Sequence, residues 1–246
     1  MTEYNHLIRD YLGINNMVRH TGFHALSEDD CRIFLRQLVP FECPDMYAVL
    51  DDKIIILEHF EFDASRSTRK GMKGKAEEAG LEKRIDESVL DSEIYIESVD
   101  RVISFQNWQT NFESCFQRHY NRISDYKKRI REKTGDNEKP IMVGFWVEDQ
   151  FPPYVRIHNR IKDLPYCRTV QFAEIICNSP NVDFVLFSGY LGGKPQIHYL
   201  DSAGLEQISD TLIDLQNENV TLSHINKNEV VMYGGFQIDE DDVDNT

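Results

Sequence analysis

Cysteine is scarce in this chain, and its pattern argues against the usual cysteine-based frameworks. The 246 residues include five cysteines, an odd number, and no two of them form a C-x-x-C pair: Cys31, Cys43, Cys115, Cys167 and Cys177. This arrangement gives no support for a zinc site or a disulfide framework. We therefore expect reduced thiols in a cytosolic environment.

Long apolar runs are also missing. No window approaches about 18 consecutive apolar residues, so no membrane-spanning helix is expected. The segment 1–12 lacks the charged-then-apolar pattern of a signal peptide. These two absences predict a soluble, cytoplasmic protein without a membrane partner.

Positive charge is in deficit, because 42 acidic residues face 27 lysines and arginines and leave a formal net charge of −15. Such a balance argues against non-specific adhesion to nucleic acid or to anionic membranes, although a local basic groove is still compatible with it. A hydrophobic content of 41% with 11% aromatic residues is ample for a core. The chain contains neither a glycine-rich phosphate loop of recognised spacing nor a Gly-x-Ser-x-Gly motif.

The most informative stretch is residues 42–63, where two β-type runs flank a short polar break and predict a hairpin. If Asp51 and Asp52 form a two-residue loop, Leu50 pairs with Lys53 and Asp45 lies directly opposite Glu58. If the loop is shifted by one residue, Asp45 faces Phe60 and Glu58 becomes its diagonal neighbour. Both registers place the two carboxylates on one face of the hairpin, because cross-strand partners share a face.

Two anions within about 5 Å of each other are unfavourable unless a positive charge lies between them. A divalent cation satisfies this requirement, and Mg²⁺ is commonly held by one or two carboxylates together with a substrate phosphate. The sequence therefore nominates Asp45 and Glu58 as ligands of Mg²⁺ or Mn²⁺.

Pro44-Asp45, a hairpin and then Glu58 resemble the PD-(D/E)XK, or restriction-endonuclease-like, nuclease superfamily, in which Pro-Asp precedes an acid-x-Lys triplet on the next strand. Phe60 occupies the usual Lys position, so the resemblance is to a divergent member. It covers roughly residues 27–150 by order of elements. It implies an α/β fold with a nuclease-like core and Mg²⁺-dependent cleavage of DNA or RNA, with Lys73 or Lys75 taking the place of the missing lysine.

A basic segment follows the predicted hairpin. It contains seven bases and three acids between residues 66 and 84, and its bases are Arg66, Arg69, Lys70, Lys73, Lys75, Lys83 and Arg84. Beside a paired-carboxylate site, Arg66, Arg69, Lys70, Lys73 and Lys75 are candidates for a nucleic-acid phosphate track. A solvated loop and helix face is the alternative interpretation.

A second arrangement of ligands is present on the same predicted strand. Strict alternation places His59 on the face opposite Glu58, together with Glu61 and Asp63, and these three could bind a metal. Without a partner from another strand, a solvated strand edge explains them better. His59 is therefore expected to be structural.

The remaining elements follow from periodicity and caps. We expect a helix that begins at Ser27 and ends before Pro40, a long amphipathic helix over 108–133, and a buried strand at 141–147. A helix at 166–178, a strand at 182–187 and a hairpin to 196–200 come next, and Ser202 is expected to cap a last helix. The resemblance also implies one more strand before the hairpin, for which residues 41–43 are available.

The predicted organisation is an α/β nuclease-like core over 1–150, a C-terminal α/β extension over 151–238 packed on the same sheet, and an acidic, disordered tail over 239–246. The alternative to a nuclease is a catalytically inactive module of the same fold that acts in a protein or nucleic-acid assembly. A homodimer is compatible with both functions.

Overall fold

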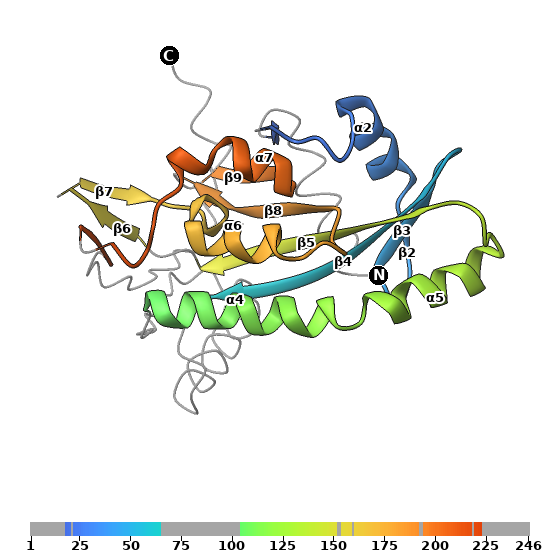
Figure 1. Cartoon of the computed structure of the whole chain (residues 1–246), viewed down its shortest axis with the longest axis horizontal. Coiled ribbons are helices and arrows are strands. Elements are labelled where there is room, and N and C mark those ends of the chain that lie inside the picture. The colour runs from blue at the N-terminus through green and yellow to red at the C-terminus, as the bar shows by residue number, and fades with distance from the viewer. Residues whose placement is uncertain are drawn as a thin grey trace, which may run out of the picture. The chain divides into compact units, whose positions relative to one another are not determined.

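The computed structural model describes residues 18–20, 22–64, 104–151, 154–158, 160–191, 194–217 and 219–222. These residues form an α/β fold around a mixed, seven-stranded sheet with the strand order β1-β9-β8-β5-β4-β3-β2 (Figure 1). Strands β4, β5 and β8 are mutually parallel in its centre. A second, three-stranded sheet has the order β10-β6-β7.

Helix α2 (Glu28–Gln37) begins where the sequence predicts, because the Ser27 Oγ accepts a hydrogen bond from the Asp30 amide at 3.0 Å. The helix ends at Leu38, and strand β2 (Val39–Pro40) follows at once. The additional strand is therefore formed by Val39–Pro40 and not by residues 41–43. It pairs antiparallel with β3.

The predicted hairpin is confirmed. It consists of β3 (Met46–Val49) and β4 (Ile54–Asp63). Its pairing Met46↔Leu57 and the 2.9 Å bond from the Leu50 amide to the Lys53 carbonyl select the register with the Asp51-Asp52 loop. In this register Asp45 precedes β3 at the level of Glu58.

Strand β4 is covered differently on its two faces. Ile55 and Leu57 belong to a core that includes Phe34 of α2, whereas Phe60 packs against Phe112 on the other face. Alternation is therefore regular along most of the strand, and it assigns His59 to the α2 face and Glu58 to the opposite face.

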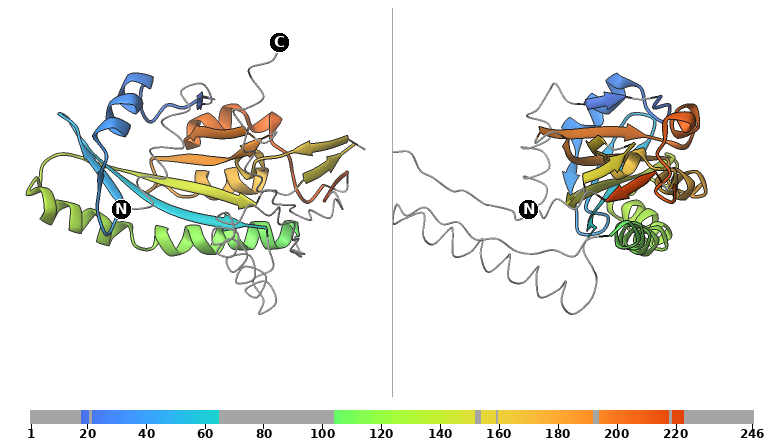
Figure 2. Two further views of the ribbon diagram at one scale, coloured as in Figure 1. Left: turned by 180° about the vertical axis from the view of Figure 1, so that it is seen from behind. Right: turned by 90° about the vertical axis from the view of Figure 1, so that its left-hand side faces the viewer.

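Helices α4 (Phe105–Tyr120) and α5 (Ile123–Thr134) replace the single long helix that the spacing predicts (Figures 1 and 2). They run end to end along the Phe60 face of the sheet. The interruption falls at Asn121 and Arg122, where the Arg122 amide donates at 3.0 Å to the His119 carbonyl three residues back and not to the carbonyl four residues back. Gly135 ends α5 in the left-handed region at φ 69°.

The long crossover through α4 and α5 leads to β5 (Ile141–Phe151), which extends the predicted buried strand by four residues. Helix α6 (Val170–Cys177) follows the 3-10 helix η3 (Tyr166–Arg168), as the apolar pattern indicates. Strands β8 (Phe184–Leu191) and β9 (Lys194–Leu200) continue the sheet as an antiparallel pair. Strand β1 (Val18–His20) forms the edge beside β9.

The last helix α7 (Ser202–Gln207) is capped by Asp201 and not by Ser202, because the Asp201 Oδ1 accepts a 2.7 Å bond from the Gly204 amide. A 3-10 turn, η4 (Ser209–Thr211), ends the helical segment. The second sheet consists of three short strands, β6 (Tyr154–Ile157), β7 (Arg160–Asp163) and β10 (Val220–Leu222). None of the helices in the described part of the chain has the length and apolar content that crossing a bilayer requires.

Candidate metal centre

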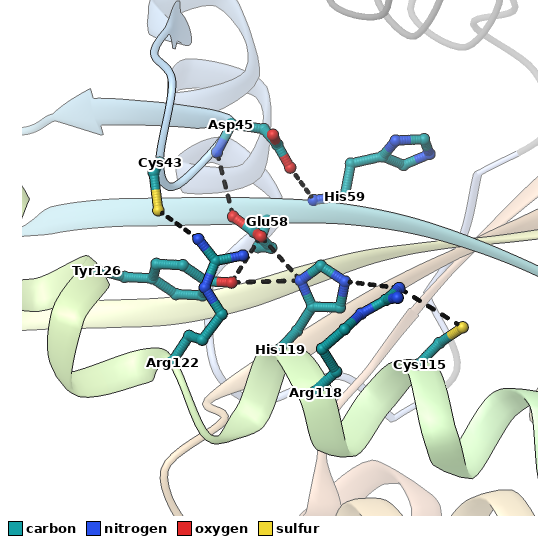
Figure 3. A network of polar contacts seen from close by, with 9 residues as sticks. All are labelled: Cys43, Asp45, Glu58, His59, Cys115, Arg118, His119, Arg122 and Tyr126. Carbon is teal, nitrogen blue, oxygen red and sulfur yellow. Dashed lines mark hydrogen bonds and ion pairs between the residues drawn. The ribbon is translucent and has the colours of Figure 1, made fainter.

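The structure brings the predicted pair Asp45 and Glu58 together through a main-chain contact. The Asp45 amide donates to the Glu58 Oε2 at 3.3 Å (Figure 3). The two side chains are aimed at different partners, because Glu58 faces helices α4 and α5 whereas the Asp45 carboxylate faces the backbone of β4. We find no contact between the two carboxylates themselves among the hydrogen bonds of the described residues.

Glu58 is the centre of a buried polar network. Its Oε1 accepts hydrogen bonds from the Tyr126 hydroxyl at 2.6 Å and from the His119 Nδ1 at 2.8 Å. Glu58 is 5% exposed, and burial together with Glu58 raises the pKa of the Tyr126 phenol. The Asp45 amide, His119 and Tyr126 thus satisfy this buried carboxylate with protein groups. Glu58 thus ties helices α4 and α5 to strand β4.

The Asp45 carboxylate performs a positioning role. Its Oδ2 accepts a 2.7 Å hydrogen bond from the His59 amide, in the part of β4 that lies beyond the start of β3. An amide that would otherwise lack a strand partner is satisfied in this way. Asp45 therefore fixes the backbone from which the His59 imidazole projects.

A second group of ligands lies on the α2 face of the sheet. His59 and Glu61 of β4 meet Glu148 of β5, and one ligand atom from each residue lies within 4.8 Å of the others. Glu61 and Glu148 are direct partners in the parallel register, and the His59 Nε2 lies 3.3 Å from the Glu148 Oε2. The side chains of His59 and Glu148 are only 7% and 8% exposed, whereas Glu61 is exposed.

This group is the alternative cluster of the sequence analysis with one member exchanged. The expected third residue, Asp63, is absent from it because the pairing of β4 with β5 shifts register between Phe62 and Asp63. Both the carbonyl and the Oδ1 of Asp63 instead contact the Asn111 amide group of α4, at 2.8 and 3.4 Å. The strand partner that the sequence did not reveal is Glu148.

The electrostatics of the group are set by its carboxylates. Burial is the largest influence on His59 and lowers its pKa, but the hydrogen bond and charge of Glu148, with the charges of Glu61 and Asp45, more than offset it. The pKa of His59 is consequently raised above its ordinary value of 6.5. A site that attracts a proton in this way also attracts a metal cation.

The donor set fits a divalent cation. Two ligand atoms that bind one ion at about 2.1 Å lie about 3 to 4 Å apart, so the observed spacing requires only a small side-chain rotation. One imidazole with two carboxylates suits Mn²⁺, Fe²⁺ or Zn²⁺ better than Mg²⁺, which favours an all-oxygen environment. His59, Glu61 and Glu148 can therefore hold an ion that leaves further coordination positions for water and substrate.

The residues nominated for phosphate binding, Arg66, Arg69, Lys70, Lys73 and Lys75, lie outside the described residues. Phe60 is 4% exposed and stacks on the His119 ring with a centroid distance of 5.1 Å. Its position therefore contributes to the core and offers no catalytic group.

A scan against protein-family models, a search of curated proteins and a search of solved structures each returned no match for this chain.

Sequence reasoning missed Glu148, although a signal for it exists. Glu148 and Asp149 end the apolar run of β5, and ligands in α/β sheets bind outside the carboxyl ends of parallel strands. An acid at that end of one strand, beside His59 and Glu61 on its parallel neighbour, is the pattern to look for.

Proposed function

We propose that this protein is a metal-dependent nuclease that hydrolyses phosphodiester bonds of DNA, with RNA as a second substrate class. The observation that carries the proposal is the convergence of His59, Glu61 and Glu148 at the carboxyl ends of two parallel strands. In this proposal the cation would lie on the α2 face of β4. It differs from the sequence-based hypothesis, in which Asp45 and Glu58 hold Mg²⁺.

The order of elements supports the same proposal. Helix α2, the β3–β4 hairpin, helices α4 and α5, and the parallel strand β5 follow one another in the order implied by the restriction-endonuclease-like resemblance. The hairpin also brings Pro44-Asp45 next to the strand that carries Glu58. A fold by itself does not define an activity, so the ligand cluster carries more weight.

Each residue then has a defined role. His59, Glu61 and Glu148 would hold the cation, and Asp45 would position His59 through its amide. When bound, a divalent cation polarises a phosphate oxygen and lowers the pKa of a coordinated water. Glu58, with Tyr126 and His119, fixes the helices against the strand that carries the site. We also propose that the side-chain charge of Lys73 or Lys75 acts on the nucleophile.

A cleavage assay with labelled single- and double-stranded DNA and RNA tests the proposal, in Mn²⁺, in Mg²⁺ and in chelator. Glu61→Gln and Glu148→Gln should each lower the cleavage rate at least 100-fold, because they remove a charged ligand at nearly constant volume. Glu174→Gln, on the exposed surface of α6, is the matched control and should retain activity.

Asp45→Asn and Glu58→Gln discriminate between the two locations of the ion. If the metal lies between Asp45 and Glu58, these variants should lose metal dependence while Glu61→Gln retains it. If the folded wild-type protein cleaves no substrate in either metal, the nuclease proposal is wrong. The inactive binding module, which the buried Phe60 at the lysine position favours, would then take its place.

A further inference from the structure

A row of four cations follows the outer surface of helices α4 and α5. Arg118 of α4, Arg122 in the turn between the two helices, and Arg129 and Lys133 of α5 are all exposed. Arg129 and Lys133 are four residues apart and so lie on the same side of α5. Over 15 residues the row extends about 22 Å, since each helical residue rises about 1.5 Å. We call these four residues the cationic row.

The row is held against the segment that leads into β3. An Arg122 guanidinium nitrogen lies 3.1 Å from the Cys43 Sγ, and the same group lies over the Tyr126 ring at 5.2 Å. The Lys133 ammonium lies 5.9 Å from the Phe41 ring centroid. Arg129 adds its positive charge to that of Arg122 at the Cys43 thiol. Arg122 and Lys133 thus contact residues of the segment 41–43, and Arg118 contacts Cys115 and His119 of its own helix.

Direct ion pairs within the described residues do not account for the row. In the described part of the chain, no carboxylate lies within ion-pair distance of any of its four side chains. The helix dipole explains Lys133 and Arg118, which lie in last turns, but it disfavours Arg122 at the start of α5. The charges of Glu58 and Asp125 act on Arg122. Four exposed cations without a direct ion pair nevertheless form a local basic surface in a chain of net charge −15, and such a surface attracts an external anion.

We infer that the cationic row binds the phosphate backbone of double-stranded nucleic acid. A length of about 22 Å corresponds to six or seven base-pair steps at about 3.4 Å each, so a straight polyanion can contact all four side chains. One end of the row, Arg118 and Arg122, adjoins the Glu58 and Asp45 contacts that position His59 (Figure 3). The choice of nucleic acid as partner rests on the proposed nuclease function.

The decisive experiment measures binding without cleavage. A fluorescein-labelled DNA duplex of about 20 base pairs is titrated with protein in EDTA, over a range of salt concentrations, and anisotropy is recorded. The test variant Arg118→Gln/Arg129→Gln/Lys133→Gln is compared with Arg156→Gln/Arg160→Gln/Lys162→Gln in β6 and β7. The two triple variants remove two arginines and one lysine each, from exposed positions, and change the net charge equally.

The row variant should bind the duplex at least tenfold more weakly and lower the slope of log K against log salt by about two to three. The β6–β7 variant should bind within about twofold of wild type. Equal losses in both triples, unchanged binding by the row variant, or no binding by wild type at low salt would overturn the inference. So would stronger binding of a poly-glutamate peptide than of the duplex.

Failure of the nuclease proposal is separable from failure of this inference. If DNA binding in EDTA depends on the row but no cleavage occurs in Mn²⁺, the phosphate-binding inference holds and the nuclease proposal is wrong. If cleavage occurs in Mn²⁺ but binding does not depend on the row, the nuclease proposal holds and the phosphate-binding inference is wrong.

Discussion

At the scale of single residues, the properties of His59 follow from the three acids around it. Its imidazole is nearly buried, contacts Glu148, and experiences the charges of Glu61 and Asp45. A histidine in apolar surroundings has a lowered pKa, whereas this one has a raised pKa because anions outweigh burial. The same arrangement makes it a good metal ligand once the proton has left.

The sign of the resulting pH dependence can be worked out for the metal-free protein. A group whose pKa is raised on folding binds its proton more tightly in the folded state. The imidazolium–Glu148 pair therefore stabilises the fold fully below about pH 6.5, and this contribution is lost as the pH rises through the raised value. An NMR titration of His59 should give a pKa above 6.5, and Glu148→Gln should lower it. A value at or below 6.5 in the wild-type protein contradicts this prediction.

Tyr126 provides a second test at this scale. Tyr126→Phe removes the 2.6 Å hydrogen bond to Glu58 and leaves a buried carboxylate with fewer donors, so the free energy of unfolding should fall by about 1–3 kcal/mol. Tyr120→Phe is the matched control, because the Tyr120 hydroxyl accepts a 3.2 Å bond from Asn181 at an exposed position. Urea denaturation measures both. Equal effects of the two substitutions would show that the buried network adds little.

At the scale of elements, local rules account for much of what was predicted. The hairpin register follows from a two-residue loop between two apolar runs, and α2 begins at Ser27 because its side chain satisfies an orphan amide. The break between α4 and α5 was not predictable from spacing, since apolar positions continue through it. The break lies in the main chain, where the Arg122 amide donates to the His119 carbonyl three residues back, and the spacing of apolar residues does not encode this bond.

Pairing between β4 and β5 is the feature that local rules could not supply. The two strands are recognisable in the sequence, but their register depends on packing across a crossover of more than 70 residues. Glu148 therefore remained unassigned, and Asp63 was grouped with His59 because the irregularity after Phe62 has no local signal. The sequence thus placed His59 and Glu61 together in an alternative cluster, whereas it nominated Asp45 and Glu58 as the metal ligands.

Gly144 tests the contact between β5 and β8 directly. A Cβ at this position would lie 2.3 Å from the Phe184 Cζ, a distance that atoms do not reach without displacement of the ring. Gly144→Ala should lower the free energy of unfolding by about 1–3 kcal/mol through overpacking. Gly144→Ala/Phe184→Leu, which supplies space for the methyl group, should lose less stability than the sum of the single variants. Additive losses in thermal or urea unfolding would indicate that the two residues are not coupled.

At the scale of the whole molecule, the topology concentrates polar groups at one end of the parallel strands. Strands β4, β5 and β8 run in the same direction, so their carboxyl ends meet on one side, where the apolar runs give way to His59, Glu61 and Glu148. Helices α4 and α5 cover the opposite face and present the cationic row outward. Asp45 links the two faces of β4, because its amide donates to Glu58 and its carboxylate accepts from the His59 amide.

A folded-state metal site also predicts a global effect on stability. A cation that binds only the folded chain raises its stability by about 2.7 kcal/mol when the free ion is at 100 times the Kd. Mn²⁺ should accordingly raise the Tm of the wild-type protein, and the shift should be smaller at pH 5.5 than at pH 8, because protons compete at His59. Identical shifts at both pH values would indicate ions bound elsewhere.

The most direct test is a titration of the metal-free protein with Mn²⁺ at pH 8. Binding is measured by isothermal titration calorimetry and by electron paramagnetic resonance of the free ion. We predict one saturable site per chain in the wild-type protein and in Glu174→Gln, with affinity reduced at least 30-fold in Glu61→Gln. Glu61 is exposed, so its substitution should leave the fold intact. Binding of equal affinity in Glu61→Gln, or no saturable binding by the wild-type protein, would contradict a metal centre formed by His59, Glu61 and Glu148.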